Sequence, residues 1–165
     1  MARSVFYSFH YKPDNWRVSQ VRNIGVLDGN KAATDNEWEK IVGQGDTAIQ
    51  NWIKSQLKGR SCTIVLAGEN TAGRKWINYE IAQSWDAGKG VLGIHIHNLL
   101  DRNQVQSRKG RNPLECVTRG KSGSPLSSIS KCYDPPYSTS TSVYKHIADN
   151  VANWIDEAIA IRARN

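Results

Sequence analysis

A chain of 165 residues, 39% hydrophobic and 22% charged, has the length and composition of one globular domain, which excludes wholesale disorder. Its apolar runs are too short to cross a bilayer, and three widely spaced cysteines exclude a disulfide or zinc framework. The 22 Lys and Arg against 15 Asp and Glu leave a net charge of +7, which favours an anionic partner. The first residues enter a predicted strand without an apolar stretch of signal-peptide length, so we expect a cytoplasmic protein.

Apolar runs alternate with amphipathic segments along the chain. The runs predict strands at 5–9, 61–67 and 91–97, and the segments predict helices at 15–24, 46–58 and 74–87, with a final helix capped by Ser142. Between the first two helices, 28–30 reads as a turn, and Thr34 to Glu37 matches a capping box before a further helix. We therefore expect a single α/β domain over 1–165, with a mostly parallel sheet, helices on both faces and a loop-rich insertion at 98–142 that contains a strand at 129–133.

In sheets of this kind, ligands bind beyond the carboxyl ends of the strands, which points to the loops after Phe9, Ala67 and His97. The second of these loops begins at Gly68 and resembles a phosphate-binding P-loop. Arg74 and Lys75 stand where that motif needs a lysine and a hydroxyl, so triphosphate hydrolysis is not expected.

The helix that follows carries Trp76 and Glu80, neighbours at i and i+4 at the edge of its apolar stripe. A carboxylate beside an aromatic ring at this edge of a sheet suits a sugar and a ring. The alternative is a first-turn glutamate favoured by the helix dipole beside a core tryptophan, and the spacing alone leaves both open.

The histidines carry weaker signals. His10 follows the first strand, where it could contact substrate or act as a hydrogen-bonded turn residue. His95 and His97 share one strand face, but no third ligand lies at a recognisable spacing, so packed histidines are favoured over a metal site. The basic stretch 102–121 is interpreted as a solvated loop, with nucleic-acid binding as the alternative.

Several of these segments together resemble a bacterial Toll/interleukin-receptor (TIR)-like domain of the Thoeris anti-phage type. The resemblance covers residues 3 to about 100 and the last helix. It is carried by 4–11 (SVFYSFHY), Trp16-Arg17, 20–23 (QVRN), 64–66 (IVL), 74–81 (RKWINYEI) and 93–96 (GIHI), and its most specific parts are the first strand end and the W-x-x-x-E helix.

The resemblance implies a flavodoxin-like fold and cleavage of the nicotinamide–ribose bond of NAD, which is the substrate, with no cofactor or metal. It places the catalytic glutamate at Glu80 and a substrate pocket at Ser8, Phe9 and His10, with Trp76 beside the glutamate. Asn70, in the preceding loop, is also predicted to bind substrate.

In Thoeris-type members, the ADP-ribose part becomes a cyclic signal that activates an effector protein. For this chain we therefore expect that signalling role, with self-association on activation and no nucleic-acid or membrane partner. A non-catalytic TIR-like scaffold that acts by protein association is the alternative, because this fold does not fix one function.

Overall fold

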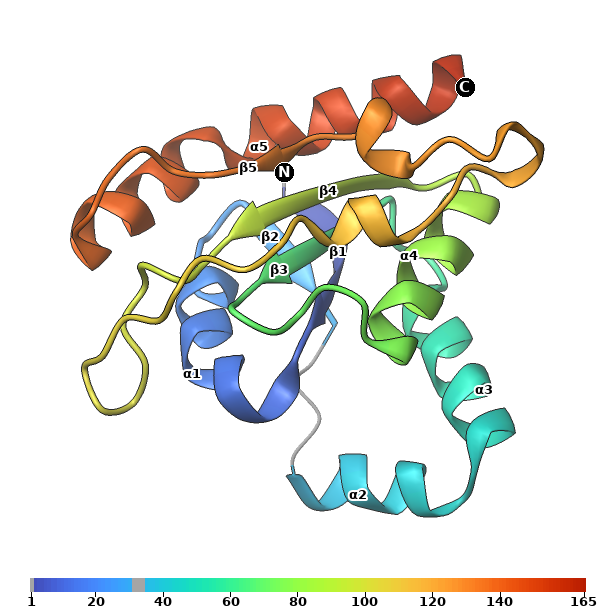
Figure 1. Cartoon of the computed structure of the whole chain (residues 1–165), viewed down its shortest axis with the longest axis horizontal. Coiled ribbons are helices and arrows are strands. Elements are labelled where there is room, and N and C mark those ends of the chain that lie inside the picture. Colours follow the sequence, from blue (N-terminus) through green and yellow to red (C-terminus); the bar gives the residue numbers. More distant parts are fainter. Residues whose placement is uncertain (1, 31–34) are drawn as a thin grey trace.

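The computed structural model describes residues 2–30 and 35–165. Within them, five parallel strands form one sheet in the order β2-β1-β3-β4-β5, with helices on both faces (Figure 1). This confirms the predicted α/β class, and the strand order is the flavodoxin-like one. The strands are β1 (Arg3–Phe9), β2 (Leu27–Gly29), β3 (Cys62–Ala67), β4 (Gly90–His95) and β5 (Cys132–Tyr133), and the helices are α1 (Tyr11–Arg22), α2 (Asp35–Gly43), α3 (Asp46–Leu57), α4 (Lys75–Asp86) and α5 (Ser140–Arg164).

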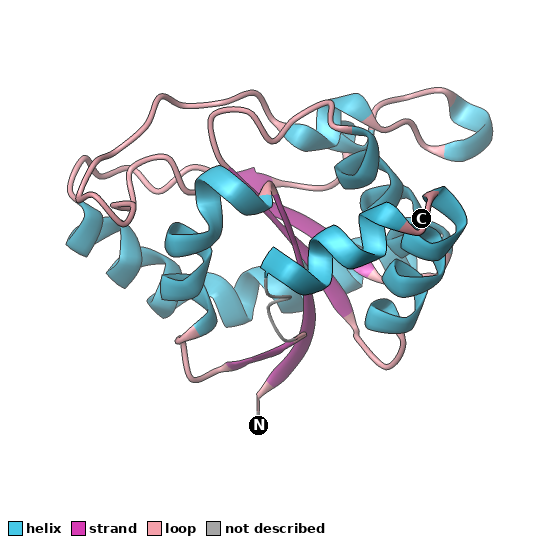
Figure 2. Cartoon of the chain, turned by 90° about the horizontal axis from the view of Figure 1, so that it is seen from below, coloured by secondary structure: helices cyan, strands magenta, loops and turns pink. Residues whose placement is uncertain are grey.

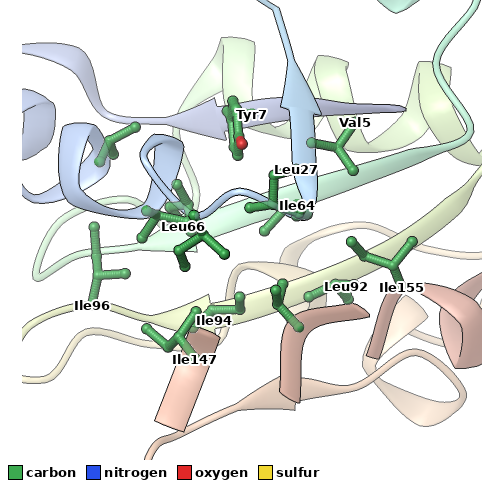
Figure 3. Packing of buried hydrophobic residues seen from close by; sticks show 14 of the residues in the cluster. Val5, Tyr7, Leu27, Ile64, Leu66, Leu92, Ile94, Ile96, Ile147 and Ile155 are labelled. Atoms are coloured by element: carbon green, nitrogen blue, oxygen red, sulfur yellow. The ribbon is translucent and has the colours of Figure 1, made fainter. Parts of the chain in front are cut away.

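One face of the sheet is covered by α1 and α5. Alternate residues of the strands, such as Tyr7, Leu66 and Ile94, pack there against Ile147 and Ile155 of α5 (Figure 3). Each fully buried aliphatic side chain of this kind stabilises the fold by about 1.5–3 kcal/mol. The sheet is therefore anchored chiefly from the α5 side.

The other face packs against α3 and α4. Phe6 of β1 joins Ile49 and Ile53 of α3, while Val65 of β3 joins Ile77 and Ile81 of α4. Because successive residues of a strand point to opposite faces, β1 contributes Tyr7 to one layer and Phe6 to the other. Figure 2 shows the strands running between helices, with the longer loops gathered at the end of the sheet away from the N-terminus.

The predicted turn at 28–30 is wrong in part. Leu27–Gly29 is a short edge strand that pairs in parallel with Arg3, Ser4 and Val5 of β1. Three residues are too few to show an apolar period, so composition alone suggested a turn. Gly29 is required because a Cβ there would lie 2.0 Å from the Tyr7 ring. The predicted capping box begins at Thr34, outside the described residues.

Two helix starts differ from the prediction. Helix α1 begins at Tyr11 rather than Asn15, because Pro13 is tolerated within the first turn and does not have to open the helix. Helix α5 is capped by Thr139 rather than Ser142: the Thr139 hydroxyl accepts a hydrogen bond from the Ser142 amide at 3.3 Å. A run rich in Ser and Thr offers several possible caps, and sequence alone does not choose among them.

Between β4 and α5 the chain consists of loops with short 3-10 turns and β5, so the strand expected at 129–133 is limited to Cys132–Tyr133. The beginning of this segment is tied down by Arg17, which donates to the carbonyls of Leu99 at 2.8 Å and Val105 at 2.9 Å. Arg17 also pairs at 3.2 Å with Asp14, and both side chains are almost completely buried. This ion pair therefore holds the loop after β4 against α1.

Candidate active site

A pocket of about 730 Å³ lies at the carboxyl ends of β1 and β3, where the strand order reverses. Ligands of open α/β sheets bind at such a reversal, and the volume is that of a small-molecule site. Its walls come from the ends of β1 and β2, both ends of α1, the loop after β3, and α3 and α4. They are Phe6, Tyr7, Phe9, His10, Tyr11, Lys12, Arg22, Asn30, Trp52, Ile53, Asn70, Ala72, Gly73, Arg74, Lys75, Trp76, Ile77 and Glu80.

The structure brings together five of the six predicted site residues as pocket walls: Phe9, His10, Asn70, Trp76 and Glu80. The sixth, Ser8, is completely buried behind them. The loops after β1 and β3 therefore meet in one crevice, as the sequence predicted. The third predicted loop, after His97, contributes no wall to this pocket in the described residues.

Glu80 is the only acidic side chain among the described walls of the pocket. It is the sixth residue of α4, and the first turn of that helix holds no acidic residue, so the interpretation as a first-turn dipole partner is wrong. Burial raises the pKa of its carboxyl well above the usual range, and the Ser8 hydroxyl lowers it by less. A buried carboxyl in a cleft with a perturbed pKa has the properties of a functional group.

Ser8 supports Glu80 from beneath. Its hydroxyl oxygen is inaccessible and makes no hydrogen bond of regular geometry among the described residues. A buried hydroxyl without a partner is unfavourable, so the Ser8 hydroxyl is available to donate a hydrogen bond. A small shift of the Glu80 carboxyl would use it, and the ionised form of the carboxyl would gain from that bond.

Aromatic side chains form the walls around the carboxyl. Trp76 contacts Tyr79 edge to face, with ring centroids 5.6 Å apart, and Phe9 lies tilted against Tyr11 at 5.9 Å. Trp52 of α3 adds a third ring to the lining. The sequence gives no signal that separates Trp52 from a core residue, because the face of α3 that it helps to bury is continuous with the wall of the pocket. Rings held in this way suit a flat heterocycle.

His10 sits at the N-cap position of α1, where its carbonyl accepts a hydrogen bond from the Asp14 amide at 3.2 Å. Its Nδ1 is buried and has no partner among the described residues. Burial, and secondly the positive charge of Arg74, lower the pKa of the imidazole, which favours the neutral form. A neutral imidazole at the mouth can donate and accept hydrogen bonds without adding positive charge.

The loop after β3 keeps its shape through its own side chains. The Thr71 hydroxyl accepts a hydrogen bond from the Gly68 amide at 2.8 Å, and Gly68 leaves room for the Asp14 carboxylate, which a Cβ would approach to 2.1 Å. This rigid turn places Asn70 at the pocket and leads into α4 at Lys75. The P-loop likeness thus reflects a tight strand-to-helix turn.

Positive charge gathers in this pocket, whose described walls include Lys12, Arg22, Arg74 and Lys75. Lys75 is paired at 2.6 Å with Asp46 on α3, and both side chains are well exposed. The sequence had drawn attention to 102–121 instead. There, Lys109 and Arg111 are exposed and take part in ion pairs, as a solvated loop would.

His95 and His97 are both buried at the end of β4, outside this pocket, with ring centroids 6.0 Å apart. Burial is the main cause that lowers the pKa of each. No group of three or more possible metal ligands occurs in the described part of the chain. Within the same residues, no helix is both long enough and apolar enough to cross a membrane.

Comparison with known proteins gives two matches. The family described as "Thoeris protein ThsB, TIR-like domain" matches residues 6–101, which run from within β1 to beyond β4 and include every predicted site residue. The chain is also 37% identical over 120 residues to a protein of Bacillus cereus (strain MSX-D12) named "Putative cyclic ADP-D-ribose synthase ThsB1". That match covers 70% of this chain but only 62% of the Bacillus protein.

Proposed function

The chain belongs to the TIR-like domain family of the Thoeris protein ThsB, and we propose that it cleaves NAD in this pocket and closes the ADP-ribose part into a cyclic nucleotide. The name of the Bacillus relative supports a cyclic ADP-ribose product. The observation that carries the proposal is Glu80, a buried carboxyl that lines an aromatic, cation-rich pocket.

The reaction does not need a general acid to protonate the leaving group. When the bond between ribose C1′ and the pyridinium nitrogen breaks, its electron pair neutralises the ring, and nicotinamide leaves as a neutral molecule. The C1′ centre becomes oxocarbenium-like, and a nucleophilic atom of the same ADP-ribose bonds to it and loses a proton. One NAD⁺ thus gives one nicotinamide, one cyclic product and one H⁺. The protein must stabilise a developing cation, as glycosidases do with a carboxylate.

Glu80 supplies the charge that this transition state needs. Burial favours its neutral form, but a cationic nicotinamide riboside group bound beside it favours the ionised form. Substrate binding therefore promotes the carboxylate, and the Ser8 hydroxyl can stabilise the same form. The charge interacts strongly because the surroundings of Glu80 exclude water.

The apolar walls favour cyclisation over hydrolysis. Phe6, Phe9 and Trp76 line the pocket with Glu80, so a substrate that fills the space leaves little room for water at C1′. A nucleophile on the folded substrate then has the advantage of proximity. We further propose that the product activates a separate effector protein and that self-association accompanies activation.

The test is incubation of the purified protein with NAD, followed by mass identification of the products. We expect equal amounts of nicotinamide and of a product that has the mass of ADP-ribose less one water. The assay is run across a range of protein concentrations, because activation through self-association predicts a steep dependence. Absence of nicotinamide at every concentration, and in lysates of phage-infected cells that express the protein, would contradict the proposal and favour a scaffold.

A further inference from the structure

Arg22 is a half-buried cation in the wall of the pocket, and the family resemblance, which includes 20–23, assigns it no role. It is the last residue of α1, and its guanidinium carbon lies 4.9 Å from the centroid of the Tyr7 ring and 5.6 Å from that of Phe9. Its Nη1 donates a hydrogen bond to the carbonyl of Asn30. These contacts fix the guanidinium group against β1.

The charge of Arg22 is not neutralised by any side chain that the structure describes. No carboxylate lies within ion-pair distance of Arg22 among the described residues, whereas Arg17, also on α1, pairs with Asp14 and Asp101. Burial lowers the pKa of Arg22, which means that its environment disfavours the charged form. An arginine remains charged all the same, so an anion from outside the fold is the natural partner for its remaining donors.

The pocket places Arg22 and Glu80 on opposite faces of the same strand. Arg22 stacks on Tyr7 and Phe9, whose rings face α1, while Glu80 neighbours Ser8, which points to the α4 side. Strand β2 pairs only with Arg3 to Val5, so the edge of β1 from Phe6 to Phe9 has no partner strand in the described residues. Both Arg22 and Glu80 are walls of the one pocket, so a ligand that fills this pocket contacts both groups.

We propose that Arg22 binds the diphosphate of a dinucleotide whose nicotinamide ribose faces Glu80. The inference rests on the proposed function, because NAD is the ligand that presents a cationic ribose and a diphosphate together. The planar guanidinium can make two parallel hydrogen bonds to phosphate oxygens, which a lysine cannot. Its partial burial makes those bonds stronger than bonds formed at the surface.

The other cations of the pocket are less suitable. Lys75 already pairs with Asp46, and both Lys75 and Arg74 are exposed at the mouth. Exposed charges are screened by salt, so they attract an approaching anion but add little to the affinity for the bound anion. Lys75 also lies over a ring, that of Trp76 at 4.8 Å, but among the described cations of the pocket Arg22 alone combines contacts to two rings with a hydrogen bond to a backbone carbonyl.

Titration calorimetry with ADP-ribose, and separately with inorganic pyrophosphate, tests this without turnover. We expect Arg22→Gln to weaken ADP-ribose binding at least tenfold, as loss of charge-assisted hydrogen bonds does. Pyrophosphate binding should weaken in parallel. In the NAD assay the same variant should raise KM by a similar factor and leave kcat within about threefold, because the diphosphate is bound equally in ground and transition states.

Arg162→Gln is the matched control. Arg162 is also half-buried, stacks on Trp85 at 4.6 Å and donates to one backbone carbonyl, but it lies outside the described pocket walls. It should lower the melting temperature about as much as Arg22→Gln and leave ADP-ribose binding unchanged. If Arg22→Gln does not fold, Arg22→Lys carries the test, with an expected weakening of about threefold to tenfold from loss of the planar fork.

Three results would overturn the inference. They are equal affinity of Arg22→Gln and the parent for ADP-ribose, a larger loss from Arg74→Gln than from Arg22→Gln, and absence of ADP-ribose binding by the parent. The proposed function fails separately, through absence of nicotinamide release. If ADP-ribose binding depends on Arg22 but NAD is not cleaved, the pocket binds a nucleotide without turnover, and the inference stands while the proposed function fails. If NAD is cleaved equally well with and without Arg22, the proposed function stands and the inference fails.

Discussion

Replacement of Glu80 by glutamine separates catalysis from folding more sharply than any other change in this chain. Glutamine keeps the volume and the helix propensity of glutamate and removes only the charge. A carboxylate about 4 Å from a unit positive charge stabilises it by about 4 kcal/mol at an effective dielectric constant of about 20. That energy corresponds to about a thousandfold in rate, and loss of one such contact typically slows turnover by about 10²–10³-fold. We therefore expect at least a hundredfold loss of nicotinamide release.

Stability should move in the opposite direction. The pKa of Glu80 is raised in the folded protein, so the folded state holds this proton more tightly than the unfolded chain does. Stability contributed by the protonated group is complete below the unfolded pKa, about 4.3, and is lost as pH rises towards the folded pKa. Glu80→Gln should thus melt at or above the parent temperature, with a larger advantage at pH 7.5 than at pH 4.5.

The assay compares product formation and melting curves of the parent, Glu80→Gln and the exposed control Glu115→Gln. The control should match the parent in both measurements. Full activity of Glu80→Gln would refute the assignment of the carboxylate. A melting temperature well below that of the parent would refute the stated balance of burial and charge, since it would mean that the ionised group stabilises the fold.

Three further predictions concern the scaffold. Gly90→Ala should reduce the free energy of unfolding in urea by about 1–3 kcal/mol, because the new Cβ would lie 2.8 Å from a backbone nitrogen of α5. Arg17→Met should reduce it by about 3–5 kcal/mol by leaving buried Asp14 unpaired, and should speed tryptic cleavage in the released loop after β4. Burial lowers the pKa of His95 and His97, so stability should fall as pH drops through about 6.5; replacing either with Gln should flatten urea midpoints measured from pH 7.5 to 5.

The parts of the fold that could be predicted are those with long apolar periods. Strands β1, β3 and β4 and helices α3 and α4 lie within a few residues of their predicted bounds, because their sequences bury complete faces. Strand β2 could not be predicted, since its three residues are held by pairing with β1 and by the space that Gly29 leaves for Tyr7. Both constraints belong to the tertiary structure.

Some residues of the candidate site could likewise be predicted from the sequence, and others could not. Glu80, Trp76 and the end of β1 were found because each occupies a recognisable position, a strand end or a helix edge, and carries the resemblance. Arg22 lies in 20–23, one of the segments that carry the resemblance, but the sequence assigned it no role, because a basic residue in the last turn of a helix is ordinarily explained by the helix dipole. Its difference from other helix-terminal arginines is visible only in the fold, where it stacks on the rings of β1 without a carboxylate partner among the described residues.

The shortness of β2 connects these observations. A longer β2 would continue the pairing with β1 beyond Val5, and Asn30, which is a wall of the pocket, would then be a strand residue. Because β2 ends at Gly29, the Asn30 side chain takes the place of a further residue of the strand and accepts a hydrogen bond from the Tyr7 amide at 2.9 Å. The feature that is hardest to predict from the sequence, a three-residue edge strand, thus brings Asn30 into the pocket wall, where its carbonyl accepts a hydrogen bond from Arg22.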